Sequence, residues 1–420
     1  MQVRGFIDEI RDLGGIKFFK LNTLDGYIQI TLNKSQTSKD LLEKFEKLTR
    51  QSCIIVEGKK VENNKAPGGF EIFPEKIEIL SIAHAPLPLD PSGKTKAELD
   101  TRLDWRSLDL RHPRNKAIFK IQSKIVQGMT EYLISNGFLQ VFTPCLMGAA
   151  SEGGAEVFSV AYFDKEAFLR QDPQLHRELT ILGGIEKLFD LGPNWRAELS
   201  HTPRHLCEHR ACAVEMAFIK DEYDVIKLEE NLVVAAVKKV KEDCERELNL
   251  LDVELKIPKQ PFPILEFPKV YDILAEFGKR FEWGEDYDRE SEVLLWKYVK
   301  EKYNSDFFFV NRFPFAVKPF YVMRVDEEPI WARSVDLLFK GMELSSGGQR
   351  EHRYEKLIEQ VKEKKMNLDS VEWFTKFFKY GAPTLGGFAI GIERLTIQML
   401  DIQNVREAVL FPRTPERLLP

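Results

Sequence analysis

The sequence predicts an α+β protein of two domains, a small barrel of β-strands followed by a larger domain built on an antiparallel sheet. The chain has 420 residues, more than the ~100 to 200 residues of one ordinary domain. Short strand patterns occupy residues 1–83, and a Pro-rich, then polar, stretch follows them. Beyond it, helices and strands mix without a regular βαβ repeat, which favours an antiparallel sheet over a doubly wound one.

The composition is that of a soluble globular protein, with 43% hydrophobic and 30% charged residues. A net charge of -5 provides no general basic field, so any nucleic-acid binding has to depend on local patches. The five cysteines form no CxxC pair, and their odd number favours reduced thiols. No stretch approaches ~18 uncharged apolar residues, so we expect neither a signal peptide nor a membrane span, and a cytoplasmic location.

Residues 1–83 are predicted to form five strands, at 3–10, 17–21, 27–32, 53–60 and 70–80. A helix beginning at the capping residue Ser38 places apolar side chains at helical spacing between the third and fourth strands. Five strands interrupted by one helix at this point favour an OB-fold barrel.

One face of this barrel is a candidate surface for unpaired bases. In the third strand Ile28 and Ile30 alternate with Gln29, so Gln29 is predicted to face outward. Phe18 faces outward by similar logic if Phe19 points into the barrel, and OB-folds stack bases on such aromatic rings. A lone aromatic is as often a core residue, so that alternative for Phe18 stays open.

Residues 84–112 are predicted to be a linker or hinge, and residues 113–420 the second domain. From Asn115, apolar residues recur on one helical face as far as Leu133, and the strand GFLQVFTP follows at 137–144.

Three segments of the second domain carry candidate chemistry, although no Walker A or GxGxxG sequence is present. Residues 194–218 place Arg196 and Glu198 on one face of a predicted strand, before a polar loop and a second strand. Residues 386–395, GGFAIGIERL, form a glycine-bearing strand that enters a helix carrying Arg394. Residues 342–354 offer Glu343 and, a little further on, a serine and an arginine, which are groups suited to Mg²⁺ and to a carboxylate.

In this order the segments resemble the three signature motifs of class II aminoacyl-tRNA synthetases. GFLQVFTP with Pro144 resembles motif 1, WRAE with its loop motif 2, and GGFAIGIERL motif 3. The stretches SEGGAEVFSVAYFDKEAFLRQDPQL, SVDLLFKGMELSSGGQREHRYE and NVREAVLFPRTPERLLP are similar to those of the archaeal-type aspartyl branch, so the resemblance covers essentially the whole chain.

The resemblance implies an enzyme that uses ATP and Mg²⁺ to activate L-aspartate and then esterifies it to tRNA, as a homodimer joined through motif 1. It implies these roles: Arg196 on the α-phosphate, Glu198 on the adenine amino group, His205 and Arg394 on the outer phosphates, and Glu343 with Ser346 on the metal. For the amino acid it implies Glu152 and Gln174 at the ammonium, Arg177, Arg350, Asp336 and Ser346 in the binding pocket, and, for the anticodon, Phe18 and Gln29.

The chain also departs from the family pattern. QDPQLHR replaces the usual QSPQLYK, so Asp172, His176 and Arg177 stand where serine, tyrosine and lysine are common. Lys318, Leu385 and His209 replace an arginine, a histidine and an aromatic residue. An asparagine-using or repurposed paralogue is therefore an alternative, and so is a catalytically weak tRNA-binding protein, although the retained ATP residues speak against the latter. Whether tRNA(Asn) is also charged is left open.

Overall fold

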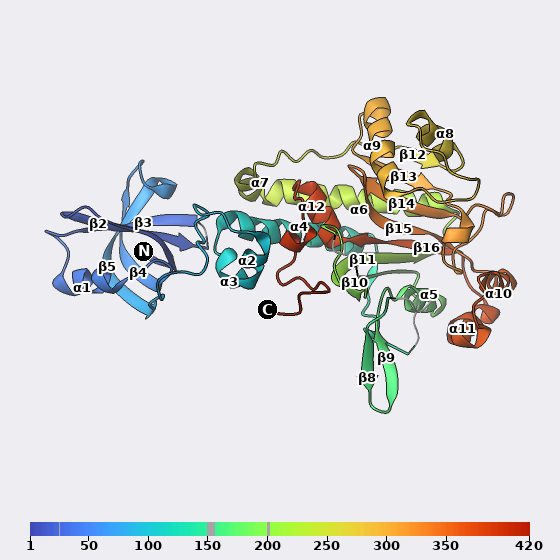
Figure 1. Cartoon of the computed structure of the whole chain (residues 1–420), viewed down its shortest axis with the longest axis horizontal. Helices are drawn as coiled ribbons and strands as arrows, with labels where there is room; N and C mark the ends of the chain where they lie inside the picture. The colour runs from blue at the N-terminus through green and yellow to red at the C-terminus, as the bar shows by residue number, and fades with distance from the viewer. Residues whose placement is uncertain (25, 149–155, 200–201) are drawn as a thin grey trace. The chain divides into compact units, whose positions relative to one another are not determined.

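The computed structural model describes residues 1–24, 26–148, 156–199 and 202–420. They form two compact units, Met1–Lys116 together with Pro420, and Ala117–Leu419 (Figure 1). The segment 84–112, which we predicted as a separate linker, groups with the first unit.

The first unit contains the predicted closed barrel, with strand order β1-β2-β3-β5-β4. The strands are β1 (Gln2–Asp12), β2 (Ile16–Thr23), β3 (Gly26–Asn33), β4 (Cys53–Glu62) and β5 (Phe70–Ser81). Helix α1 (Lys39–Lys47) lies between β3 and β4, and the Ser38 side chain caps it by accepting a hydrogen bond from the backbone of Leu41. The barrel prediction is confirmed.

The outer face of β2 and β3 carries the two predicted base-contacting residues. Phe19 is completely buried in the barrel, whereas its neighbour Phe18 is half-buried, so Phe18 is not an ordinary core residue. Phe18 pairs with Thr31 and Gln29 pairs with Lys20 across the two strands. The Gln29 amide donates to Glu71 over 3.0 Å.

After the barrel come two short helices, α2 (Leu99–Asp104) and α3 (Arg106–Asp109). Arg106 and Asp109 are both buried and form an ion pair of 2.6 Å. The Asn22 amide of β2 donates to the Arg111 carbonyl over 2.6 Å, and the Arg111 guanidinium lies 3.8 Å from the centre of the Phe6 ring. These contacts join the segment to the barrel strands.

The second unit is built on an eight-stranded sheet of order β12-β13-β14-β15-β16-β11-β10-β6. Its strands are β6 (Leu139–Gln140), β10 (Lys187–Trp195), β11 (Glu208–Ala217), β12 (Ile264–Glu266), β13 (Phe307–Asn311), β14 (Ser334–Phe339), β15 (Met342–Arg350) and β16 (Leu385–Gly391). Only the outer pairs β6·β10 and β12·β13 are parallel among these described strands. The predicted antiparallel α+β architecture is confirmed, although β6 is much shorter than the predicted strand 137–144.

One face of this sheet is covered by helices α4 (Pro113–Ser135) and α6 (Glu222–Asp243). The predicted apolar face of α4 is buried, with Ile121, Ile125, Met129 and Leu133 fully inaccessible, in a core shared with α6 and the sheet. Gly128 allows the two helices to approach, because a Cβ there would lie 2.8 Å from Lys239. The other face of the sheet is therefore left for the candidate site.

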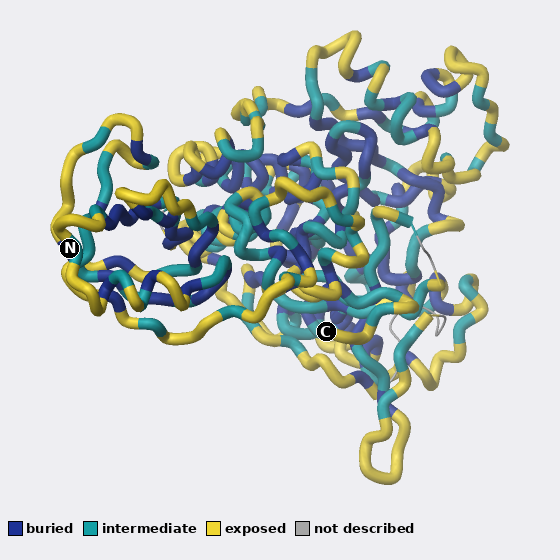
Figure 2. Tube along the Cα trace, turned by 60° about the vertical axis from the view of Figure 1, so that its left-hand side comes forward, coloured by how far each residue is buried: buried dark blue, intermediate teal, exposed yellow. Residues whose placement is uncertain are grey.

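The remaining elements surround the sheet. A small three-stranded sheet contains β7 (Leu146–Met147), β8 (Ser159–Tyr162) and β9 (Lys165–Leu169), and the β8–β9 hairpin projects with an exposed end (Figure 2). The other helices are α5 (Gln174–Leu182), α7 (Glu245–Leu251), α8 (Lys269–Glu276), α9 (Arg289–Tyr303), α10 (Tyr354–Glu363), α11 (Leu368–Thr375) and α12 (Ile392–Met399). Short 3-10 helices span Pro67–Gly69, Phe315–Val317, Lys376–Tyr380 and Val405–Ala408. Among the described residues, no helix is long and apolar enough to span a bilayer.

Candidate active site

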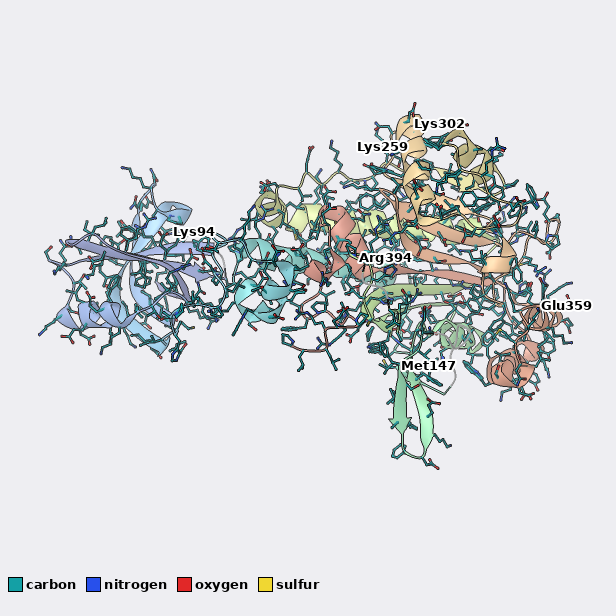
Figure 3. All side chains as sticks on the ribbon, viewed as in Figure 1. Lys94, Met147, Lys259, Lys302, Glu359 and Arg394 are labelled. Carbon is teal, nitrogen blue, oxygen red and sulfur yellow. The ribbon has the colours of Figure 1, made fainter. Side chains whose placement is uncertain are left out.

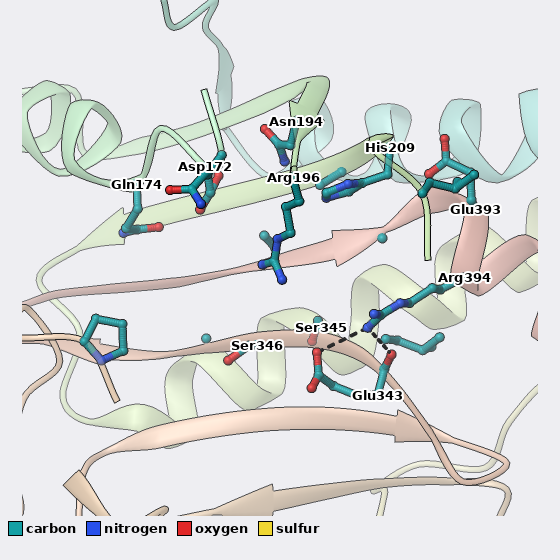
Figure 4. Close-up of a pocket in the computed structure, with 18 of the residues that line it drawn as sticks. Asp172, Gln174, Asn194, Arg196, His209, Glu343, Ser345, Ser346, Glu393 and Arg394 are labelled. Carbon is teal, nitrogen blue, oxygen red and sulfur yellow. Dashed lines mark hydrogen bonds and ion pairs between the residues drawn. The ribbon is translucent and has the colours of Figure 1, made fainter. Parts of the chain in front are cut away.

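A cavity of ≈ 360 Å³ opens over the uncovered face of the large sheet (Figure 4). This volume lies within the range of pockets that bind small molecules. The predicted site residues that line the cavity are Gln174, Arg196, Glu198, His205, Glu343, Ser346, Arg350 and Arg394. The fold thus gathers residues that are up to about half the chain apart in sequence.

Small residues of β11 and β16, Ala211 and Gly391 among them, line this cavity. Across the pairing of β11 and β16, Ala211 lies opposite Gly391, and Glu215 lies opposite Gly387. A Cβ on Gly387 would lie 2.0 Å from the Val214 carbonyl oxygen and 2.5 Å from Glu215 Oε2. The absence of a side chain at Gly387 therefore provides the space in which the Glu215 carboxylate lies.

A β-bulge in β15 explains how Glu343 and Ser346 share the cavity. Residues three apart face opposite sides of a regular strand. The pairing of β14 with β15 shifts by one residue between Leu337 and Leu338, which leaves Leu344 as the extra residue. This extra residue brings Glu343 and Ser346 to the same face.

Arg394 stands on α12, directly after β16, and points across the cavity toward β15. Its Nη1 donates to the Glu343 carbonyl oxygen over 3.1 Å and to Glu343 Oε1 over 3.4 Å (Figure 4). Arg394 lies well inside the second unit, whereas Lys302 and Glu359 project from its outer helices (Figure 3). A fixed cation is thereby held at one end of the cavity.

The prediction that Arg196 and Glu198 share a strand face is wrong. Strand β10 ends at Trp195, so both residues lie in the connection beyond it. The Arg196 backbone N–H donates to the Cys207 carbonyl over 3.0 Å and continues the hairpin for one more pair. Arg196 Nη1 lies 3.4 Å from Glu198 Oε1, and His205 Nε2 lies 3.7 Å from Glu198 Oε2. The hydrogen bond between the Arg196 and Cys207 backbones, and not a shared strand face, therefore positions the side chains of Arg196, Glu198 and His205.

Two described histidines of this region, His205 and His209, have pKa values below the usual one, which favours their neutral form at pH 7. Burial lowers the pKa of His205, with Arg394 acting in the same direction and Glu198 against it. Burial, reinforced by Arg196 and Arg394, lowers the pKa of His209 to about 4. His209 is paired with Asn194 across β10 and β11. Its neutral, flat ring at the cavity wall is suited to stacking on a planar base.

At the other end of the cavity, Asp172 and Arg350 line the wall, and each is paired with a residue buried behind it. Arg177 holds Asp172 through two bonds, Nη1 to Oδ1 at 2.8 Å and Nη2 to Oδ2 at 2.6 Å. Arg350 Nε donates to Glu215 Oε1 over 3.0 Å. Gln174 connects the pairs, because its Oε1 accepts from Arg177 over 2.7 Å and its Nε2 donates to Glu215 over 2.9 Å.

These pairs fix the protonation states of the cluster. Burial alone would raise the pKa of Asp172, but Arg177 outweighs it and holds the pKa below the usual value. Burial would lower the pKa of Arg350, but Glu215 outweighs it and raises it. Glu178, which also accepts from Gln174 over 3.1 Å, has its pKa raised to about 8 by burial and by Glu215. Glu178 is therefore protonated at neutral pH.

Asp336 lies buried beneath the cavity and does not line it. Lys318 Nζ lies 3.2 Å from Asp336 Oδ2, and Ser346 pairs with Asp336 across the strands. Burial raises the pKa of Asp336 to about 6, with Glu343 adding to the shift and Lys318 opposing it. Glu292 of α9 has its pKa raised to about 7 by burial and then by Glu343. The negative charge of Glu343 thus disfavours the ionised forms of both Asp336 and Glu292.

The remaining predicted residues lie elsewhere. Arg177 is buried behind Asp172, and Phe18 and Gln29 belong to the barrel of the first unit. Glu152 lies outside the described residues. Sequence reasoning missed Glu178, although its position four residues after Gln174 on one helix was a usable signal. It also missed Glu292, which no local pattern connects to the other segments.

Two known protein families match this chain, one over most of the second unit and one over the barrel of the first. Residues 98–415 match the family described as tRNA synthetases class II (D, K and N). Residues 1–80 match the OB-fold nucleic acid binding domain.

Individual relatives are similar over the full length. The chain is 47% identical to the aspartate–tRNA(Asp) ligase of Pyrococcus furiosus and 42% identical to the aspartate–tRNA(Asp/Asn) ligase of Methanopyrus kandleri, covering all of this chain and 96% of each. Among solved structures, asparaginyl-tRNA synthetase from Pyrococcus horikoshii with asparaginyl-adenylate superimposes with a TM-score of 0.92 at 33% identity, covering all of this chain and 96% of that one. Aspartyl tRNA synthetase from Entamoeba histolytica gives a TM-score of 0.90 at 30% identity, covering 100% and 89%.

Proposed function

The chain belongs to the class II aminoacyl-tRNA synthetases, ATP-dependent ligases of the aspartate, lysine and asparagine group, and we propose that it is an aspartate–tRNA ligase. It activates aspartate with ATP and transfers the aspartyl group to tRNA. One observation carries this proposal, namely that a single cavity is lined by Arg196 and Arg394 toward one end and, at the other, by Arg350, which is paired with the buried Glu215. The cationic residues suit the triphosphate of ATP, and the Arg350 end suits an amino acid.

The first step is an in-line displacement at phosphorus. An α-carboxylate oxygen of aspartate attacks the α-phosphorus of ATP, a new P–O bond forms, and the bond to the bridging oxygen breaks, so that pyrophosphate leaves. Arg196 and Arg394 stabilise the charge that gathers on the phosphate oxygens, with Arg196 on the α-phosphate and Arg394, with His205, on the outer phosphates. Glu198 accepts from the adenine amino group, and the neutral His209 ring stacks on the base.

The second step is acyl transfer to tRNA. A terminal ribose hydroxyl of tRNA attacks the carbonyl carbon of the aspartyl-adenylate, an ester forms, and AMP leaves. No side chain forms a covalent bond with the substrate in either step, so the residues act by positioning and by charge. Gln174 and Glu152 hold the substrate ammonium, and Arg350, supported by Arg177, Asp336 and Ser346, forms the side-chain pocket.

The donor set around Glu343 fits Mg²⁺. Burial and the nearby Glu343 carboxylate raise the pKa of both Glu292 and Asp336, and Ser346 adds a hydroxyl oxygen, so a hard cation is favoured there. Glu343 and Ser346 would hold the ion. When bound, Mg²⁺ neutralises phosphate charge.

We also propose that the barrel binds the anticodon of tRNA and that the chain forms a homodimer. Phe18 and Gln29 lie on one half-buried face, which suits stacking and hydrogen bonding of an anticodon base. Leu139, Phe142 and Leu146, in and just after motif 1, are 53%, 85% and 45% exposed, an apolar surface that a second copy of the chain would cover in a homodimer.

Amino-acid-dependent pyrophosphate exchange, run with all twenty amino acids, tests the function. We expect exchange with aspartate, and charging of tRNA(Asp) in a second assay that also includes tRNA(Asn). Exchange with no amino acid would contradict the proposal and favour a tRNA-binding protein without catalysis.

A further inference from the structure

Asp172 occupies a position between the cavity and a buried cation. It lies in the connection between β9 and α5, its side chain is 20% exposed, and it lines the cavity beside Gln174 (Figure 4). Arg177 behind it is 1% exposed and does not line the cavity. Both terminal nitrogens of the guanidinium donate to Asp172, one to each carboxylate oxygen. A ligand in the cavity would therefore contact the Asp172 carboxylate and not the Arg177 guanidinium that lies behind it.

Among the described residues, the charged side chains around this end of the cavity are paired with one another. Asp172 offsets Arg177, Glu215 offsets Arg350, and Gln174 joins the two pairs as a neutral bridge. Lys318 is paired in the same way with Asp336. Burial and Glu215 raise the pKa of Glu178, which favours its uncharged form.

A buried site whose cations are already paired gives little preference to a carboxylate over an amide. A carboxylate brings one negative charge for which no unpaired cation is left, whereas an amide of the same shape brings no charge. If Arg177 were not paired, its positive charge would favour the carboxylate. Asp172 removes that preference while both arginines keep their places.

We propose that Asp172 is a specificity-determining residue, which by neutralising Arg177 makes the cavity discriminate only weakly between aspartate and asparagine. This inference rests on the proposed ligase function and refines its substrate range. Arg350 still binds the side chain of either substrate, so aspartate remains a substrate.

The test is the ratio of kcat/KM for aspartate to kcat/KM for asparagine, measured by pyrophosphate exchange. Both substrates are assayed on one preparation, so a partly unfolded variant does not change the ratio. We expect a ratio below ~10 in the parent, and an increase of ~10-fold or more in Asp172→Ser and Asp172→Asn through a lower KM for aspartate. Asp164→Ser, which removes an exposed carboxylate from the β8–β9 turn, should leave the ratio unchanged.

A double variant separates charge from shape. Asp172→Ser with Arg177→Met removes both charges, so the ratio should return to the parent value. A parent ratio above ~1000, or single variants that keep the parent ratio, would overturn the inference while leaving an aspartate ligase in place. A double variant that keeps the ratio of Asp172→Ser would also overturn it, because shape rather than charge would then decide. A parent that activates neither amino acid contradicts the proposed function itself.

Discussion

At the scale of single residues, the cavity holds its charged side chains in place before a ligand arrives. Arg394 is anchored on Glu343, Arg177 on Asp172 and Arg350 on Glu215. A guanidinium that is already oriented loses little conformational freedom when a phosphate or carboxylate binds. Such preorganisation is what electrostatic catalysis requires.

Arg394→Ala should lower aspartate-dependent pyrophosphate exchange by ~100-fold or more, because it removes a fixed cation from the developing phosphate charge. Arg196→Ala should have an effect of similar size. The matched control is Arg280→Ala, which removes an exposed arginine from the connection between α8 and α9. Near-normal exchange in both cavity variants would exclude the proposed phosphate site, provided that circular dichroism shows intact folding.

Glu229 of α6 predicts a pH dependence of stability. It is completely buried, bonds Ser345, and its Oε2 has no partner among the described residues. Burial raises its pKa from 4.5 to about 8. Between these values the folded state keeps a proton that the unfolded state releases, so stability falls as pH rises, by at most about 1.4 kcal/mol per pH unit.

Glu229→Gln keeps a hydrogen-bonding group but cannot titrate. Its free energy of unfolding should therefore fall less than that of the parent between pH 5 and pH 8. Denaturant titrations at both pH values measure this difference, and Glu254→Gln, at a carboxylate that is 84% exposed, serves as the control. Equal decreases in Glu229→Gln and the parent would show that Glu229 is ionised in the folded state.

At the scale of elements, sequence periodicity predicted the helices and strands whose position depends on local packing. The apolar face of α4, the barrel strands and the β16–α12 junction follow from burial patterns and are found as expected. The end of β10 at Trp195 and the bulge at Leu344 were not predictable, because both are set by pairing with strands far away in sequence. Asp172 and Arg177 were recognised in the sequence as departures from the family pattern, but the two hydrogen bonds between them depend on where α5 begins.

Gly387→Ala should disrupt this arrangement of strands. The added methyl group would lie 2.0 Å from a backbone oxygen of β11 and would press on Glu215, the partner of Arg350. We expect a loss of about 1 to 3 kcal/mol in stability, as for other overpacked sites, and a raised KM for aspartate. Gly391→Ala in the same strand meets nothing closer than 3.7 Å, so its denaturation midpoint should match the parent's. A stable Gly387→Ala with normal KM would contradict the close packing.

At the scale of the whole molecule, the proposed activation site and the proposed anticodon surface belong to different units. The cavity and its charged residues belong to the second unit, and the outer barrel face with Phe18 belongs to the first. We therefore expect amino-acid activation and tRNA recognition to be separable by mutation.

Phe18→Ala should weaken aminoacylation of tRNA while leaving pyrophosphate exchange intact. A base stacked on an aromatic ring contributes ~1 to 3 kcal/mol, which corresponds to ~5 to 150-fold in kcat/KM for tRNA. Both assays on the same preparation give the comparison directly. Equal losses in the two assays would identify Phe18 as a folding residue instead.

The eight-stranded sheet ends on both sides in very short strands, β6 with two residues and β12 with three. A long, flat outer strand presents unpaired N–H and C=O groups that can recruit a strand from another chain and begin aggregation. Here the broad sheet offers little backbone of that kind at either edge. The short edges of this sheet thus give another chain little backbone on which to begin a fibre.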